Sequence, residues 1–135
     1  MSTTHQIKVA QQQGEHFKAF VNDYEFSISG DANIAGARPK PLLLASLAGC
    51  TGIDVVSLLA KMRVQYSDFS LDVSADLTEE HPKVYSVIYL TYNIKVNDSD
   101  KDKVEKAVKL SEEKYCGVSA MLIKNCPIHV KINYL

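Results

Sequence analysis

The stretch PLLLASLAGCTGIDVVSLLAKMR, residues 41–63, is an almost uninterrupted apolar run with a cysteine, two glycines and an aspartate near its centre. Its length predicts a helix over residues 41–62, roughly 30 Å long at 1.5 Å per residue. Apolar residues stand on every side of this helix, so we expect protein to surround it. A run of about 20 apolar residues can also cross a bilayer. Asp54, in mid-run, would cost about 2.5–3.5 kcal/mol there, so we expect no membrane span.

Segments of alternating polarity flank this helix on both sides. Upstream, residues 7–9, 17–21 and 24–28 are separated by turn-forming residues and predict a small antiparallel meander. Downstream, residues 69–77 alternate strictly between apolar and polar, which is typical of a strand with one wet face. Residues 84–96 predict a longer and more central strand.

The last third of the chain predicts two helices and a final strand. Val104, Ala107 and Val108 form a narrow apolar stripe, which indicates a surface helix, and a second helical segment follows Cys116. The element order predicts an α+β fold in a single domain over residues 1–135. It consists of an N-terminal antiparallel meander, a long buried central helix and a second antiparallel sheet with two helices. Because a chain of this length surrounds such a helix with difficulty, we expect an intertwined homodimer.

Composition excludes some classes of partner and suggests a compartment. The 135 residues are 46% hydrophobic and carry a formal net charge of −1, so there is no basic surface for nucleic acid. The N-terminal residues lack the apolar core of a signal peptide, and we expect a cytoplasmic protein. Cysteines in that reducing compartment are more often reactive, metal-bound or inert than bridged.

Three cysteines are the candidates for chemistry. Cys50 lies in the apolar run and is either an inert core thiol or a reactive one, with little side-chain bulk around it. Cys116 lies between two helical segments, and a helix N-terminus stabilises a thiolate. The alternative is that Ser119 caps that helix and Cys116 is incidental. Cys126 precedes a proline at a strand start and is interpreted as structural.

Three charged residues are candidates for tuning the Cys50 thiol. Asp54 lies four residues on, on the same helical face, and a carboxylate there disfavours the thiolate. Arg38 and Lys40, just upstream, are the cations nearest in sequence that could offset it. The alternative for Asp54 is a buried carboxylate satisfied by backbone groups or a tyrosine hydroxyl.

The sequence predicts no metal site and no bound cofactor. Cys126 and His129 lie three residues apart on a predicted strand, so their side chains point to opposite faces. Two cysteines in helical contexts fit a different chemistry, in which one thiolate is oxidised by a peroxide and the second thiol condenses with it to a disulfide.

Two segments together resemble the OsmC/Ohr superfamily of osmotically inducible and organic hydroperoxide resistance proteins. These are RPKPLLLASLAGCTGIDVVSLLAKMR and, much later, SEEKYCGVSAML. The resemblance covers most of the chain and implies an intertwined homodimer with active sites at the subunit interface. It also implies an antioxidant peroxidase for organic hydroperoxides, with Cys50 as the peroxidatic residue and Cys116 as its resolving partner. An external dithiol of the dihydrolipoyl kind would be the reductant.

The likeness is better to an OsmC-like branch than to the hydroperoxide resistance proteins. Those proteins carry a glutamate where this chain has Lys40, and an activating arginine in N-terminal strands that here contain none. Gly117-Val118 stands where they have proline and tyrosine. The alternatives to a peroxidase are a small-molecule binding module without peroxidase activity, and another thiol chemistry such as hydrolysis or thiol transfer.

Overall fold

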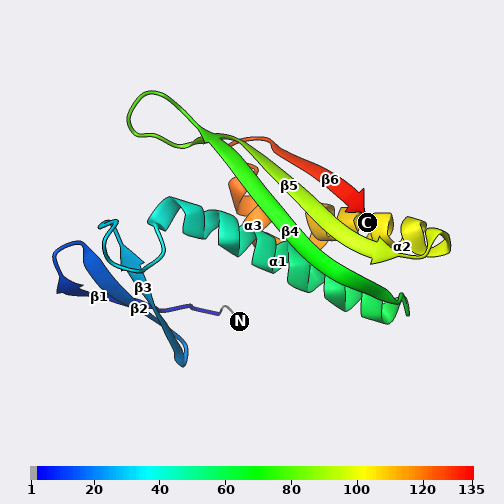
Figure 1. Cartoon of the computed structure of the whole chain (residues 1–135), viewed down its shortest axis with the longest axis horizontal. Helices are drawn as coiled ribbons and strands as arrows, with labels where there is room; N and C mark the ends of the chain where they lie inside the picture. Colours follow the sequence, from blue (N-terminus) through cyan, green and yellow to red (C-terminus); the bar gives the residue numbers. More distant parts are fainter. Residues whose placement is uncertain (1–2) are drawn as a thin grey trace. The chain divides into compact units, whose positions relative to one another are not determined.

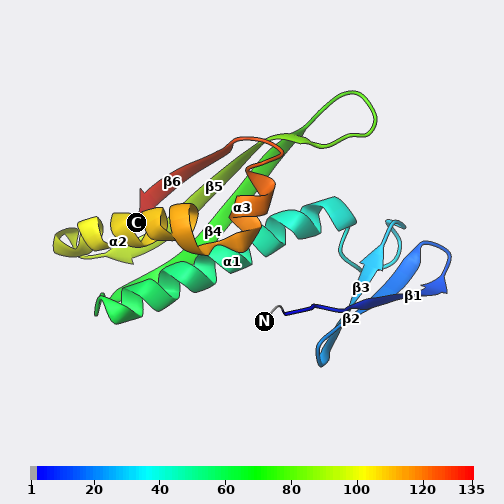
Figure 2. The same cartoon turned by 180° about the vertical axis from the view of Figure 1, so that it is seen from behind.

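The computed structural model describes residues 3–135, and in them the chain forms two compact units. The N-terminal unit ends at Leu43, and the C-terminal unit spans Leu44–Leu135. The single domain expected from the sequence stays a prediction. Figure 1 follows the chain through its elements, and Figure 2 presents the same elements from behind.

The N-terminal unit contains the antiparallel meander that the sequence predicted. Strands β1 (Lys8–Gln13), β2 (His16–Val21) and β3 (Tyr24–Ser29) pair in the order β1-β2-β3. Both connections use a positive φ, +56° at Gly14 and +55° at Asn22, as tight hairpin turns require. After β3 the chain returns alongside it, since the Ala37 N–H donates to the Ser27 carbonyl at 2.9 Å. This leads the chain directly into the long helix.

The apolar run forms helix α1 (Pro39–Lys61), two residues earlier at its start than predicted. Prolines are tolerated in the first turn because the amides there have no helical partner. At the other end Arg63 adopts a φ of +58°, and the N–H of Val64 donates to the Leu59 carbonyl at 3.0 Å, which closes the helix. Within residues 3–135, α1 alone is long and apolar enough to cross a membrane, a property that core helices of soluble proteins share.

The C-terminal unit covers only one face of α1. Leu47, Val55 and Leu59 are fully buried, whereas Ile53 is 72% exposed and Val56 39%. The C-terminal unit alone therefore does not surround the helix, and the homodimer expected to complete its cover stays a prediction. The physical reason is that all the sheet and helix packing of the C-terminal unit falls on one side of α1. The uncovered side is apolar as well.

The second sheet has the order β4-β5-β6, and the strand predicted over residues 84–96 lies in the centre as expected, although β4 is as long as β5. Strand β4 (Tyr66–Leu77) pairs antiparallel with β5 (Tyr85–Val96), but β5 pairs parallel with β6 (Ile128–Tyr134). The sheet is mixed, and the prediction of a wholly antiparallel one was wrong in this detail. A parallel pair needs a long crossover. Here the crossover contains η1 (Asp98–Asp100), α2 (Lys101–Leu110), η2 (Ser111–Tyr115) and α3 (Gly117–Leu122).

The main core lies between this sheet and the helices on one of its faces (Figures 1 and 2). The predicted stripe of α2 is confirmed, because Val104, Ala107 and Val108 are all buried. The buried residues are Val55, Leu59, Val64, Leu90, Tyr92, Ile94, Val104, Ala107 and Val108. Since α1 and the segment that follows α2 share this face, residues distant in sequence meet there.

Candidate functional site

Helix α1 presents Cys50 and Asp54 one turn apart, on the edge of its buried face. Both side chains are half-buried, and the intervening Thr51 points into the core. Residues four apart on a helix are neighbours on its surface. The sequence pattern alone therefore places this thiol and this carboxylate together.

The second cysteine is positioned by a turn that is wider than an α-turn. The Cys116 N–H donates to the Ser111 carbonyl, five residues back, at 2.9 Å, so η2 is a π-helical turn. Cys116 then adopts an extended backbone (φ −80°, ψ 104°) and is the N-cap of α3, where its sulfur accepts a hydrogen bond from the Ser119 N–H at 3.3 Å. The predicted position at a helix start is confirmed. The cap is Cys116 itself, while Ser119 contributes its backbone amide.

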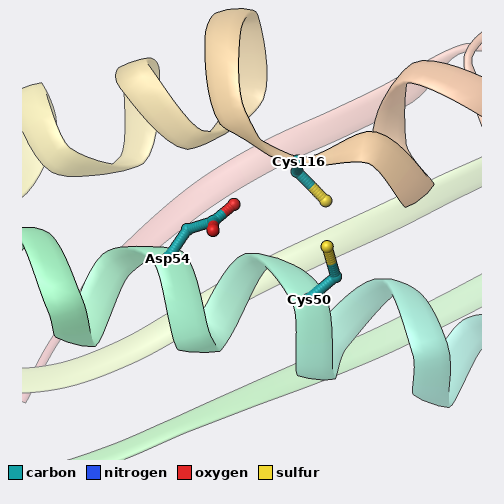
Figure 3. A group of neighbouring side chains, drawn as sticks. All are labelled: Cys50, Asp54 and Cys116. Carbon is teal, nitrogen blue, oxygen red and sulfur yellow. The ribbon is translucent and has the colours of Figure 1, made fainter. Parts of the chain in front are cut away.

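The fold brings the two thiols and the carboxylate into one cluster (Figure 3). Cys50 Sγ, Cys116 Sγ and a carboxylate oxygen of Asp54 all lie within 4.8 Å of one another. In Figure 3 the two sulfurs point toward each other, one from α1 and one from the start of α3. The Ser111 hydroxyl donates to Asp54 Oδ2 at 3.0 Å and so orients the carboxylate. All four residues belong to the C-terminal unit.

The electrostatics of the cluster keep a proton on Cys116. Burial is the main cause that raises the pKa of Cys116 to about 11, and its hydrogen bond with Cys50 raises it next. The Ser119 amide lowers that pKa, whereas the charges of Cys50 and Asp54 raise it further. Cys116 is only 4% exposed, so the thiol is neutral at physiological pH.

Tyr92 lies beneath the cluster, in the central strand of the sheet. It is 1% exposed, and its side chain forms a hydrogen bond with Thr51. Burial raises the pKa of Tyr92 to about 12, with smaller contributions from charges that include Cys116 and Asp54. The Tyr92 hydroxyl therefore keeps its proton, and is neutral, at physiological pH.

The other residues singled out from the sequence belong to other parts of the chain. Arg38 belongs to the N-terminal unit, where its guanidinium donates to the Gly30 carbonyl at 2.6 Å. Lys40 is in the first turn of α1, ten residues before Cys50. Cys126 is buried in a small core cluster beside Leu47 and Ile88, as expected of a structural thiol.

Sequence reasoning missed the role of Ser111 and the pocket beside Asp54. No motif in the sequence marks Ser111, yet its hydroxyl contacts a carboxylate 57 residues away. The pocket has a volume of about 250 Å³ and is lined by Asp54, Ser57, Leu58, Lys61 and Tyr115. Because these residues come from two elements, no local pattern marks the pocket.

Two adjacent thiols with a carboxylate allow two kinds of chemistry. They can form a disulfide after one sulfur is oxidised, or they can share a thiophilic metal ion as ligands. Within residues 3–135, Cys50, Asp54 and Cys116 are the set of metal-ligating side chains that gathers closely enough for the second.

Comparison with known proteins gives a consistent family assignment. The family model described as OsmC-like protein matches residues 29–131. Protein YhfA from Escherichia coli strain K12 is 33% identical over 101 residues, which cover 75% of this chain and 75% of that protein.

Solved structures share the fold over nearly the whole chain. A hypothetical protein from Aquifex aeolicus is 27% identical and superposes with a TM-score of 0.88 over 99% of this chain and 98% of the other. An organic hydroperoxide resistance protein from Elizabethkingia anophelis is 17% identical, with a TM-score of 0.70 over 100% of both chains. The chain therefore belongs to the OsmC-like protein family, and its paired thiols lie within that family's α+β fold.

Proposed function

We propose that the protein is a thiol-dependent peroxidase that reduces organic hydroperoxides in defence against oxidative stress, using Cys50 and Cys116. The observation that carries the proposal is the cluster itself, in which the two reduced sulfurs face each other within 4.8 Å. Membership of a family whose fold also occurs in organic hydroperoxide resistance proteins supports it.

The reaction divides between a half-buried thiol and a buried one. The Cys50 thiolate attacks a peroxide oxygen, and with one proton the O–O bond breaks to give an alcohol and Cys50 sulfenic acid. The Cys116 thiol then condenses with the sulfenic acid, which forms the Cys50–Cys116 disulfide and releases water. An external dithiol of the dihydrolipoyl kind reduces the disulfide and is itself oxidised to a disulfide.

The electrostatics suit Cys116 to act second. Its pKa is raised to about 11 by burial, by the hydrogen bond with Cys50 and by the charges of Cys50 and Asp54. Cys116 therefore keeps its proton while Cys50 is the attacking group. When Cys50 becomes a neutral sulfenic acid, the contribution of its charge disappears, and the pKa of Cys116 falls at the step that needs its thiolate.

We also propose that the working form is a cytoplasmic homodimer. On the uncovered side of α1, a hollow of about 530 Å³ is lined by apolar side chains that include Ile53, Val56 and Leu71. A Cβ added at Gly49, on the same helix, would meet no atom within 4 Å apart from its chain neighbours and the adjacent helix backbone. A second copy that covers this surface would bury the apolar side chains of α1 that the C-terminal unit leaves exposed to solvent. A reducing compartment would keep the dithiol ready for the next peroxide.

The test is to treat the reduced protein with cumene hydroperoxide and to identify the product by peptide mass spectrometry. The expected product is the Cys50–Cys116 disulfide, and in Cys116→Ser a sulfenic acid at Cys50 that dimedone traps. Cys126→Ser is the matched control and should form the disulfide as the parent does. If Cys50 stays reduced while thiols of the denatured protein react, the peroxidase proposal fails, and a binding module becomes the better explanation.

A further inference from the structure

We propose that Cys50, Cys116 and Asp54 also form a binding site for a thiophilic divalent cation of the Zn²⁺ class. The site uses the same two sulfurs as the proposed peroxidase, so it would regulate that function, but it does not depend on peroxide being the substrate. No local sequence motif predicts it, because Cys116 joins the other two ligands only in the folded chain.

The spacing of the three ligand atoms is compatible with a shared metal ion. With Zn–S distances of about 2.3 Å, ligand atoms around a tetrahedral zinc lie about 3.7 Å apart. Here the three ligand atoms lie within 4.8 Å of one another. Binding would therefore bring each pair of ligand atoms closer by about 1 Å at most.

The donor set selects the class of cation. Two thiolates favour zinc and other soft metals, whereas magnesium and calcium prefer sites made wholly of oxygen. Ser111 supports the third ligand, since its hydroxyl donates to Asp54 Oδ2 at 3.0 Å and leaves Oδ1 available. Hydrogen bonds of this kind orient the ligands of natural metal sites. The Ser119 amide holds the Cys116 sulfur in the same way.

Charge and access are compatible with a cation. Within the described residues Asp54 forms no ion pair, and the cation that shares its pocket is Lys61. Two thiolates and a carboxylate carry three negative charges, which a divalent ion offsets in part. Cys50 and Asp54 are half-buried rather than enclosed, and Asp54 also lines a pocket of about 250 Å³.

Binding of the cation and oxidation by peroxide would exclude each other. Coordination of both thiols releases their two protons and forms two metal–sulfur bonds. The bound sulfurs are then shielded from the peroxide, and the disulfide has no thiolate to offer a metal. The cation would therefore hold the protein in a protected, inactive state.

The experiment uses the full chain, reduced and freed of metal, with Co²⁺ as the spectroscopic probe. One Co²⁺ per chain is expected to give the thiolate charge-transfer band and the visible bands of a tetrahedral ion. Zn²⁺ should abolish these bands and Mg²⁺ should not. Cys50→Ser and Cys116→Ser should each weaken the charge-transfer band, while Cys126→Ser keeps it. Ser111→Ala should keep the band but lower the affinity about 10–100-fold.

A second measurement on the unmutated protein guards against variants that fail to fold. Zn²⁺ should protect Cys50 and Cys116 of the folded protein from alkylation, as read by peptide mass spectrometry. It should not protect Cys126 when the chain is unfolded. The proposal is overturned if no band forms, if Cys126→Ser removes it, or if Cys50→Ser and Cys116→Ser leave it unchanged. If the metal-free protein forms the disulfide with peroxide but binds no Co²⁺, only the metal site is refuted. If the protein binds Co²⁺ but does not react with peroxide, only the proposed peroxidase activity is refuted.

Discussion

At the scale of single residues, the properties of the site come from neighbours that are distant in sequence. Ser111 is fully buried and contacts Asp54 across 57 residues of chain, and Cys116 is buried against Cys50. Ser111 orients the Asp54 carboxylate, and Cys50 changes the pKa of Cys116. Single substitutions should therefore have effects at sites they do not occupy.

Cys50→Ser should lower the pKa of Cys116 from about 11 toward its ordinary value of 9.0. The hydrogen bond and the charge of Cys50 both raise that pKa, and both are lost or weakened in the variant, although burial still raises it. The pH dependence of alkylation at Cys116, followed by peptide mass spectrometry in the reduced protein, should begin at a lower pH. Cys126→Ser should leave that onset in place. An unchanged onset in Cys50→Ser would mean that the two thiols do not interact.

Ser111→Ala should lower the free energy of unfolding by about 1–2 kcal/mol. The variant removes the hydroxyl that donates to the Asp54 carboxylate and leaves a small void at a fully buried position. Urea denaturation measures the loss. The control is Ser74→Ala on the wet face of β4, which should stay within about 0.5 kcal/mol of the parent. Equal values for the two variants would remove the structural role given to Ser111.

At the scale of elements, α1 and η2 determine which side chains come into contact in the cluster. Helix α1 buries one face on the sheet and leaves a second apolar face open. The π-turn adds one residue to the end of α2, so that Ser111 and Cys116 both reach α1. Such turns are frequent at functional sites, because they aim side chains that a regular helix would direct elsewhere.

Ile53→Lys should convert a dimer into a monomer. Ile53 is 72% exposed in the single chain and lines the apolar hollow, so a lysine there would place a charge in the proposed interface between copies. Light scattering coupled to size-exclusion chromatography gives the molar mass directly. Met121→Lys on α3, at a residue of similar exposure (67%), should leave the mass at two chains. A parent protein that is monomeric at all concentrations would contradict the proposed dimer.

At the scale of the whole molecule, stability depends on the core between the mixed sheet and its helices. Leu90 is 2% exposed in the central strand, whereas Leu77, at the end of β4, is 46% exposed. Strands β4, β5 and β6 reach the helices through this same layer of side chains. Truncations in the layer should therefore destabilise the C-terminal unit far more than truncations at its edge.

Leu90→Ala should cost about 2–5 kcal/mol of unfolding free energy, because it removes buried contacts and leaves a cavity. Leu77→Ala should cost less than about 1 kcal/mol, because that side chain is largely in water already. Chemical denaturation monitored by circular dichroism compares the two. Similar losses at both positions would place the core elsewhere.

The sequence by itself determined the elements and their order. A long apolar run located α1. Hydrophobic periodicity located β4 and the buried stripe of α2, because those patterns report on which face of an element avoids water. It also placed Cys50 beside Asp54, since the spacing within one helix fixes that pair. The helical contexts of Cys50 and Cys116 suggested a redox pair, and resemblance to a known family assigned their roles. Their separation in sequence carries no geometric information, so their contact could not be derived from it.

Tertiary structure decided the rest. The parallel pairing of β6, the π-turn before Cys116 and the Ser111–Asp54 hydrogen bond depend on how finished elements pack against one another. The two sulfurs meet because the crossover from β5 to β6 returns over α1 on the same face of the sheet. Local sequence sets the faces of helices and strands, but only packing of the whole unit brings a thiol from one element against a thiol from another.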